Sequence, residues 1–166
     1  MKNYELFMQR IKAEILAELQ QVSKLMDEYK DFIDKYSGHM DAYLLRVKAS
    51  FMADFYMGIE KIFRLIIEEL NGGTPRGEGW HKRLLTAMSL ELKGIRPAVI
   101  SHVLYSDLLK FLGFRHVVRQ AYGFQLDPRK LEELEQIFMK TWETSAKEIN
   151  LFCRFLEGKT ANKKKS

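Results

Sequence analysis

Apolar side chains recur at spacings of three and four residues over long stretches of this 166-residue chain. That spacing gathers them on one face of an α-helix. It predicts a first helix over about residues 3–36 and a second over about 40–70, with Ser37-Gly38 between them. Asn71-Gly72-Gly73 ends the second helix, because these residue types tolerate left-handed backbone angles. Two long helices joined by so short a turn are expected to lie antiparallel, as in a bundle.

Shorter patterns fill the rest of the chain. Residues 72–79 indicate a glycine-rich linker, since they follow a helix and lack the Gly-Lys-Ser/Thr ending of a phosphate-binding loop. A third helix is predicted over about 80–91, a fourth from Ser101 as N-cap to about Tyr122, and a fifth that starts at Asp127-Pro128. No segment shows the period of two that is typical of strands. The expected fold class is all-α, an antiparallel bundle of about five helices.

Composition favours one globular domain over residues 1–157, followed by a basic flexible tail over residues 158–166. Hydrophobic residues make up 46% and charged residues 30% of the chain, which is too apolar for a disordered protein. The tail contains Lys159, Lys163, Lys164 and Lys165 and accounts for most of the net charge of +5. Charge alone is therefore weak evidence for a nucleic-acid partner.

Several classes of protein and site are not expected. The chain has no stretch of about 18 apolar residues to span a membrane, and its amino end is unlike a signal peptide. We therefore expect a soluble, cytoplasmic protein. The four histidines share no metal-ligand spacing, so neither a metal nor a cofactor is predicted. Cys153 lies among apolar residues and is expected to be a buried core residue, not a reactive thiol.

One position breaks the apolar pattern of the predicted fourth helix. The stripe on its buried face consists of Leu104, Leu108, Phe111, Arg115, Val118 and Tyr122. A guanidinium keeps its charge, so a buried Arg115 needs a carboxylate, a carbonyl or a phosphate. With His116 and Arg119 beside it, such a set would suit binding and cleaving a phosphodiester. Alternatively, Arg115 could form a structural salt bridge with Asp54 or Glu60. Spacing alone leaves both interpretations open.

Residues 114–127, with the sequence FRHVVRQAYGFQLD, resemble the signature stretch of HepT-like proteins of the HEPN superfamily. Residues 56–63, 80–85 and 95–101 support the resemblance, which spreads over most of residues 5–156. It implies a helical bundle that forms a homodimer and acts as a metal-independent endoribonuclease, the toxin of a toxin–antitoxin pair. It also implies two partners. One is RNA, and the other is a minimal nucleotidyltransferase antitoxin, which adenylylates a tyrosine in Arg-x4-His-x-Tyr.

The resemblance assigns roles to individual residues of this sequence. Arg115 matches the motif arginine and Tyr122 matches the modified tyrosine. From their residue types and positions beside Arg115, Arg119 and His116 are predicted to bind RNA. The motif histidine falls on Gln120, whose amide cannot exchange a proton near pH 7 as an imidazole can. We therefore expect a ribonuclease that is inactive or weakened.

Three explanations for glutamine at position 120 stay open. The chain is a natural non-catalytic relative, another residue has taken over the proton transfer, or the sequence is a His→Gln variant. The non-catalytic case would leave a binding partner of a nucleotidyltransferase. Positions 115 and 120 lie about 140° apart around an ideal helix. A site shared between the two subunits of a dimer would ease this separation.

Overall fold

Five helices make up most of the computed structural model, which describes residues 2–38, 41–120, 122 and 125–162. They are α1 (Lys2–Tyr36), α2 (Ala42–Leu70), α3 (Trp80–Met88), α4 (His102–Gln120) and α5 (Pro128–Asn162). Within the described residues there is no strand, and the only bridge of the β type pairs Leu92 with Arg96. The all-α class and the count of about five helices are confirmed.

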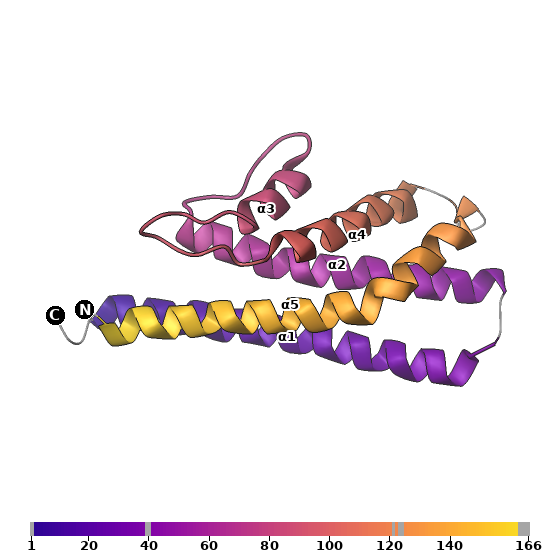
Figure 1. Ribbon diagram of the computed structural model, residues 1–166, viewed down its shortest axis with the longest axis horizontal. Coiled ribbons are helices and arrows are strands. Elements are labelled where there is room, and N and C mark those ends of the chain that lie inside the picture. Colours follow the sequence, from indigo (N-terminus) through magenta and orange to yellow (C-terminus); the bar gives the residue numbers. More distant parts are fainter. Residues whose placement is uncertain (1, 39–40, 121, 123–124, 163–166) are drawn as a thin grey trace.

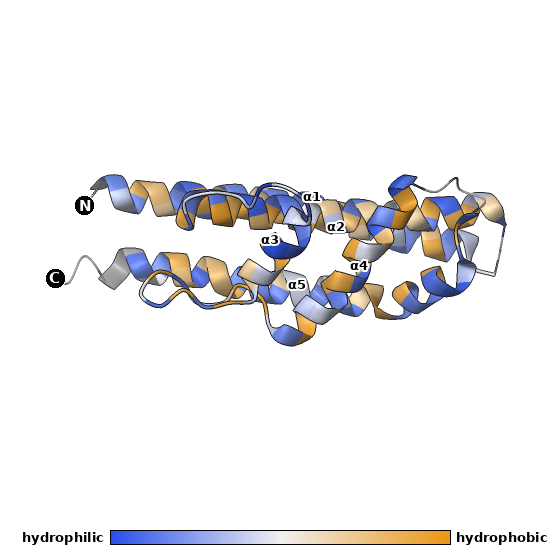
Figure 2. Cartoon of the chain, turned by 90° about the horizontal axis from the view of Figure 1, so that it is seen from above, coloured by the Kyte–Doolittle hydropathy of each residue, from blue (hydrophilic) through white to orange (hydrophobic). Residues whose placement is uncertain are grey.

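Helix α2 is the centre of the bundle and packs against each of the other four helices. Figure 1 shows α1 and α5 side by side along the length of the molecule, while α3 and α4 lie across the other side of α2. Each long helix carries hydrophobic and hydrophilic residues on different sides (Figure 2). Neighbouring helices can therefore bury their apolar sides against one another while polar sides face water.

Side-chain caps fix where three helices begin. Asp41 Oδ1 accepts hydrogen bonds from the backbone N–H groups of Tyr43 and Leu44 at the start of α2. Ser101 Oγ accepts from the N–H of Leu104, and Asp127 Oδ1 accepts from the N–H of Arg129. Each cap satisfies a donor that lacks a partner within the first helical turn. The predicted N-caps Ser101 and Asp127 are confirmed.

Two helix ends come earlier than predicted. Helix α3 stops at Met88 instead of about residue 91, because the carbonyl of Met88 accepts from the N–H of Val99 at 2.8 Å. Helix α4 stops at Gln120 instead of about Tyr122, whose N–H donates to the side chain of Gln125 at 2.9 Å. In both places a contact outside the helix competes with continuation of the helical hydrogen bonds.

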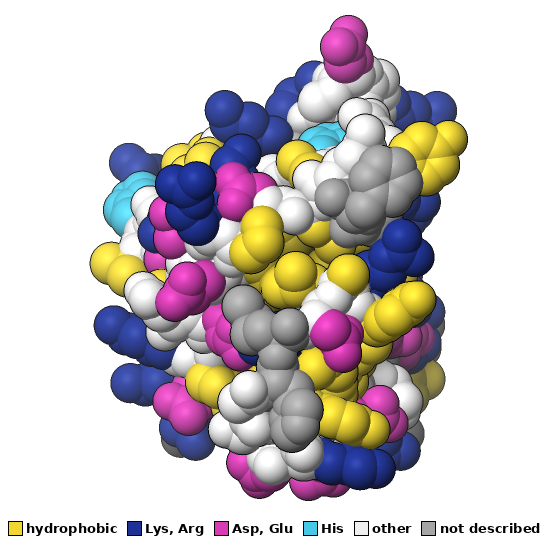
Figure 3. Space-filling view, turned by 90° about the vertical axis from the view of Figure 1, so that its right-hand side faces the viewer, with side chains coloured by type: hydrophobic (Ala, Val, Ile, Leu, Met, Phe, Trp, Pro, Cys, Tyr) yellow, Lys and Arg dark blue, Asp and Glu magenta, His cyan; other side chains and the backbone are white. Residues whose placement is uncertain are grey.

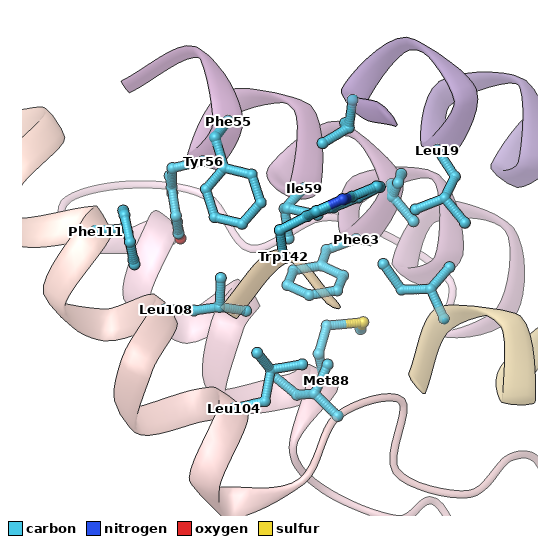
Figure 4. Close-up of a cluster of buried hydrophobic side chains, with 14 of the residues drawn as sticks. Leu19, Phe55, Tyr56, Ile59, Phe63, Met88, Leu104, Leu108, Phe111 and Trp142 are labelled. Atoms are coloured by element: carbon cyan, nitrogen blue, oxygen red, sulfur yellow. The ribbon is translucent and has the colours of Figure 1, made fainter. Parts of the chain in front are cut away.

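The buried core is formed by aromatic and aliphatic side chains from all five helices. Figure 4 shows Phe55, Ile59 and Phe63 of α2 in one cluster with Leu108 of α4 and Trp142 of α5. Gly58 of α2 faces Val22 of α1, and a Cβ there would lie only 2.6 Å from Cγ2 of Val22. The absence of a side chain at this position therefore sets the spacing between the two helices.

Cys153 is a core residue, as its apolar surroundings predict. Only 3% of its surface is exposed, and burial raises the pKa of its thiol to about 11. The reactive thiolate form is therefore scarce near neutral pH.

Helix α5 changes direction part of the way along its length (Figure 1). Its buried Thr141 and Ser145 hydroxyls donate to the carbonyls four residues earlier, at 2.8 Å and 2.7 Å. Such bonds compete for the helical acceptors and often bend a helix. The bend brings the first part of α5 towards the end of α4, where the two helices are in contact.

Helix α5 also continues beyond the predicted domain boundary at residue 157, as far as Asn162. Part of the segment expected to be a flexible tail is therefore helical, and residues 163–166 lie outside the described residues. Among the described residues, no helix is both long and apolar enough to span a bilayer.

Candidate functional site

Arg115 lies on α4 at the meeting point of three helices, and only 6% of its surface is exposed. Its Nη1 lies 3.5 Å from Oε1 of Glu60 on α2 and 3.3 Å from Nδ1 of His81 on α3. The position of Arg115 in the apolar stripe correctly predicted its burial. Glu60 is also one of the two carboxylates that the structural interpretation named, and the salt bridge it forms with Arg115 is long.

The contact of Glu60 with His81 is shorter than its contact with Arg115. The distance between Oε2 of Glu60 and Nδ1 of His81 is 2.6 Å, and so short a contact with a carboxylate requires a hydrogen between the two atoms. We therefore infer that Nδ1 carries a hydrogen and donates it to Glu60. A nitrogen that donates in this way has no lone pair for Arg115, so the contact of 3.3 Å between them is not a second hydrogen bond.

Arg115 is left with unused hydrogen-bonding capacity. Its Nε is buried and has no hydrogen-bond partner among the residues that the structure describes. Buried donors normally have a partner, and a charged donor without one is costly. An anion that reached the guanidinium could supply the missing acceptor.

Arg96 shows how a structural arginine is satisfied in the same protein. Only 2% of its surface is exposed, and burial lowers the pKa of its guanidinium. Its three nitrogens donate at 2.9–3.0 Å to the side chain of Asn71 and to the carbonyls of Ala87, Leu90 and Pro97. Arg96 thus ties the end of α2 to the end of α3. Arg115, by contrast, has one long ion pair and an unpartnered nitrogen.

Arg115 also lines a groove of about 380 Å³ between α2 and α4. Arg46 and Arg119 line the same groove and carry two further positive charges, while Asp54 is its one carboxylate. Partial burial raises the pKa of Asp54. Three guanidinium groups against one carboxylate make a positively charged hollow, and planar guanidinium groups suit phosphate oxygens especially well.

The structure does not bring all the predicted site residues together. His116 is exposed, and its ring lies edge-on to the ring of His81 with 5.9 Å between the centroids. Gln120 is exposed at the last position of α4 and is not among the residues that line the groove. Tyr122 follows the helix and is 71% exposed. Ala121, Gly123 and Phe124 lie outside the described residues. One chain therefore unites Arg115 with Arg119 but not with position 120.

The surface beside this motif is mainly apolar, with the charged Lys110, Asp127, Lys130 and Glu133 also on its lining. A hollow of about 710 Å³ between α4 and the start of α5 is lined by residues that include Phe114, Val117 and Ile137. Figure 3 views the end of the molecule where α4 finishes, and shows apolar side chains gathered in the middle of that face within a ring of charged ones. A contiguous exposed apolar surface is typical of a protein–protein contact.

Sequence reasoning missed two contributors to the site. His81 and Arg46 lie in other helices, and His81 is 34 residues from Arg115, so helical spacing could not connect them. In the sequence, the Trp80-His81 pair supported the family resemblance but did not suggest a chemical role for His81. The described residues contain no cluster of His, Cys, Asp or Glu that could hold a metal ion.

The fold and the site together define an all-helical bundle with a buried arginine beside a basic groove. Residues 48–156 match the family model for HepT-like proteins. This match covers most of the chain, from α2 to α5, so the chain belongs to the HepT-like family and is a protein of the HEPN type. The resemblance of residues 114–127 to that family is confirmed. No curated protein and no solved structure matches the chain.

Proposed function

We propose that this protein is an RNA-binding toxin of the HepT type whose ribonuclease activity is weakened by Gln120. The observation that carries the proposal is Arg115, a buried guanidinium with an unpartnered Nε that lines a groove with two further arginines. A phosphate of the RNA backbone would supply the missing acceptor. In the cleavage reaction Arg115 would stabilise the negative charge that develops on this phosphate.

The proposal includes a homodimer. Gln120 does not line the groove that contains Arg115, so a complete site needs position 120 from a second copy of the chain. The apolar hollow beside Phe114 and Val117 offers a surface that such a copy could bury. Burial of apolar surface is the main favourable term in most protein associations.

RNA binding is expected to weaken steeply as salt is added, because the groove would hold the backbone through its charges. For single-stranded nucleic acid, log K falls against log salt with a slope of about −0.7 for each phosphate contact. Arg119→Gln should weaken binding and lower this slope by about 0.7, or one phosphate contact. A gel-shift titration of a short single-stranded RNA at several salt concentrations measures both quantities.

Arg10→Gln is the matched control, since Arg10 is an exposed residue of α1 that does not line the groove. It should leave the slope unchanged. Absence of RNA binding, or binding that does not depend on salt, would contradict the proposal.

A second candidate function is supported by the exposure of Tyr122. A modifying enzyme needs access to the phenol, and 71% of the surface of this residue is exposed. On this view the protein is a non-catalytic partner of a minimal nucleotidyltransferase, and Tyr122 is its modification point. The phenol oxygen would attack the α-phosphate of ATP, releasing pyrophosphate and leaving an adenylyl group on the tyrosine.

Incubation with such an enzyme and ATP is expected to raise the intact mass of the protein by one or more adenylyl groups. Tyr122→Phe should remove the increase, because it lacks only the attacking hydroxyl. Tyr43→Phe should still gain the mass, because Tyr43 is similarly exposed, at 77%, but lies on α2. An unmodified protein in the presence of an active enzyme would eliminate this candidate.

A further inference from the structure

We propose that His81, oriented by Glu60, is the acid–base group of this site and stands in for the histidine that position 120 lacks. This inference rests on the proposed ribonuclease function. It assigns a chemical role to a residue of α3 that lies outside the motif at residues 114–127. Its basis is a set of contacts among α2, α3 and α4.

The ring of His81 is held in one orientation. Its Nδ1 lies 2.6 Å from Oε2 of Glu60, and its ring stacks on Trp80 with 3.7 Å between the centroids. Because Nδ1 donates to the carboxylate, Nε2 is the ring nitrogen left to exchange a proton. A carboxylate that binds one imidazole nitrogen fixes the tautomer and stabilises the charged ring that forms when the other nitrogen takes a proton.

His81 is also close to the group that would bind the phosphate. Its Nδ1 lies 3.3 Å from Nη1 of Arg115, so the two side chains are neighbours, although His81 is not among the residues that line the groove with Arg115. A phosphate bound on the His81 side of this guanidinium would bring the adjoining ribose near the imidazole. The side chain of His81 is 17% exposed, which leaves part of the ring open. Among the described histidines, His81 is the one in contact with Arg115.

The surrounding charges suit a proton-transfer group. Glu60 of α2 contributes a negative charge and Arg115 of α4 a positive one, and both face the imidazole. Tyr56 of α2 stays protonated, because burial raises the pKa of its phenol. The exposed His116 of α4 lies edge-on to the ring, and Arg64 of α2 packs over the ring of Trp80. No second carboxylate among the described residues contacts His81.

The reaction that follows is a transesterification that needs no metal and no water. Nε2 of neutral His81 takes the proton of the ribose 2′-hydroxyl, and the 2′-oxygen forms a bond to phosphorus. The bond from phosphorus to the 5′-oxygen breaks, and this oxygen leaves with the proton that the imidazolium returns. The products are a 2′,3′-cyclic phosphate and a 5′-hydroxyl, and His81 ends in its neutral form.

His81→Asn tests this role with little change of shape, because the asparagine amide can still donate a hydrogen bond to Glu60. We expect cleavage of a labelled single-stranded RNA to slow by about 10²–10⁴-fold, while the affinity for that RNA and the Tm stay unchanged. The unsubstituted chain should cleave faster as pH rises, because only a neutral imidazole can accept the proton of the 2′-hydroxyl. The variant should lose this rise.

His102→Asn is the matched control, since His102 is exposed at the opposite end of α4. It should cleave like the unsubstituted chain. His81→Ala gives a second measurement: imidazole added to the buffer should restore part of its cleavage without changing its Tm. A histidine that only supports the fold would show no such rescue.

The outcomes separate this inference from the proposed function. If RNA is bound and the chain as written does not cut it, or if His81→Asn cuts with the same rate and pH profile, the role of His81 is overturned. If only a Gln120→His variant cuts, the ribonuclease function stands and the role of His81 does not. If every His81 variant unfolds, this histidine is structural. Loss of RNA binding by the unsubstituted chain would overturn the proposed function itself.

Discussion

Gln120→His is expected to raise the rate of RNA cleavage by about 10²–10⁴-fold, the usual contribution of a positioned acid–base group. An amide cannot exchange a proton near neutral pH, whereas an imidazole can act as either acid or base. With His81 already in the site, a dimer of the variant would place two imidazoles there. One could then accept the 2′-hydroxyl proton while the other protonates the leaving oxygen. Time courses of a labelled RNA with a large excess of protein measure this rate.

The substitution should affect chemistry without affecting the fold. Gln120 is exposed at the end of α4, and surface substitutions usually change the free energy of unfolding by about 0.5 kcal/mol or less. Gln136→His is the matched control, because Gln136 is an exposed glutamine of α5. It should leave cleavage unchanged. Equal rates for Gln120→His and the unsubstituted chain would mean that position 120 takes no part in the reaction.

The double variant His81→Asn/Gln120→His shows whether the two imidazoles cooperate. Groups that act in one transition state give effects that do not add, because removal of either one disables the same step. We therefore expect the double variant to cleave more slowly than Gln120→His. The ratio of these two rates should differ from the ratio of the rates of His81→Asn and the unsubstituted chain. Equal ratios would mean that the two residues act in independent steps.

Arg96→Ala is expected to lower the free energy of unfolding by about 3–5 kcal/mol, because four acceptors lose their donor at once and each such loss costs about 1–3 kcal/mol where water cannot replace it. The change strips donors from the carbonyls of Ala87, Leu90 and Pro97 and from the side chain of Asn71. These acceptors lie in partly buried positions, and those that water cannot reach after the change carry most of the cost. Denaturant titration followed by the helical circular dichroism signal measures the change.

Two further variants make this result specific. Arg96→Lys retains the charge but not the planar fork, so its loss of stability should be smaller than that of Arg96→Ala yet still measurable. Arg129→Ala removes an exposed arginine of α5 and should have almost no effect. If Arg96→Ala and Arg129→Ala had the same free energy of unfolding, the connection between α2 and α3 would not depend on the side chain of Arg96.

Much of the fold could be predicted because it is encoded locally. The spacing of apolar residues located all five helices, and the caps at Ser101 and Asp127 were recognisable from residue type and position. The early end of α3 could not be predicted, because it depends on a bond between Met88 and Val99 across a turn. The bend in α5 likewise follows from which hydroxyls become buried, and that depends on packing.

The site was predictable only in part, for the same reason. Arg115 was conspicuous because a charged residue occupied a place in an apolar stripe, and its burial is confirmed. The proposed roles of Gln120 and Tyr122 came from family resemblance and stay predictions. His81 escaped notice because its importance lies in contacts with Glu60 and Arg115, which only the folded chain creates. Spacing within one helix carries no information about a residue on another.

The contrast between the buried Arg115 and the exposed Gln120 bears on how such a protein can change in evolution. Arg115 is enclosed by three helices, so its loss would disturb packing and leave Glu60 with one partner fewer. Position 120 lies at the surface, where most side chains are tolerated by the fold. Under the proposed ribonuclease function, mutations that disarm the protein should therefore accumulate at position 120 and spare Arg115. On that proposal, one substitution would remove the activity and the reverse one would restore it, while the folded scaffold persists.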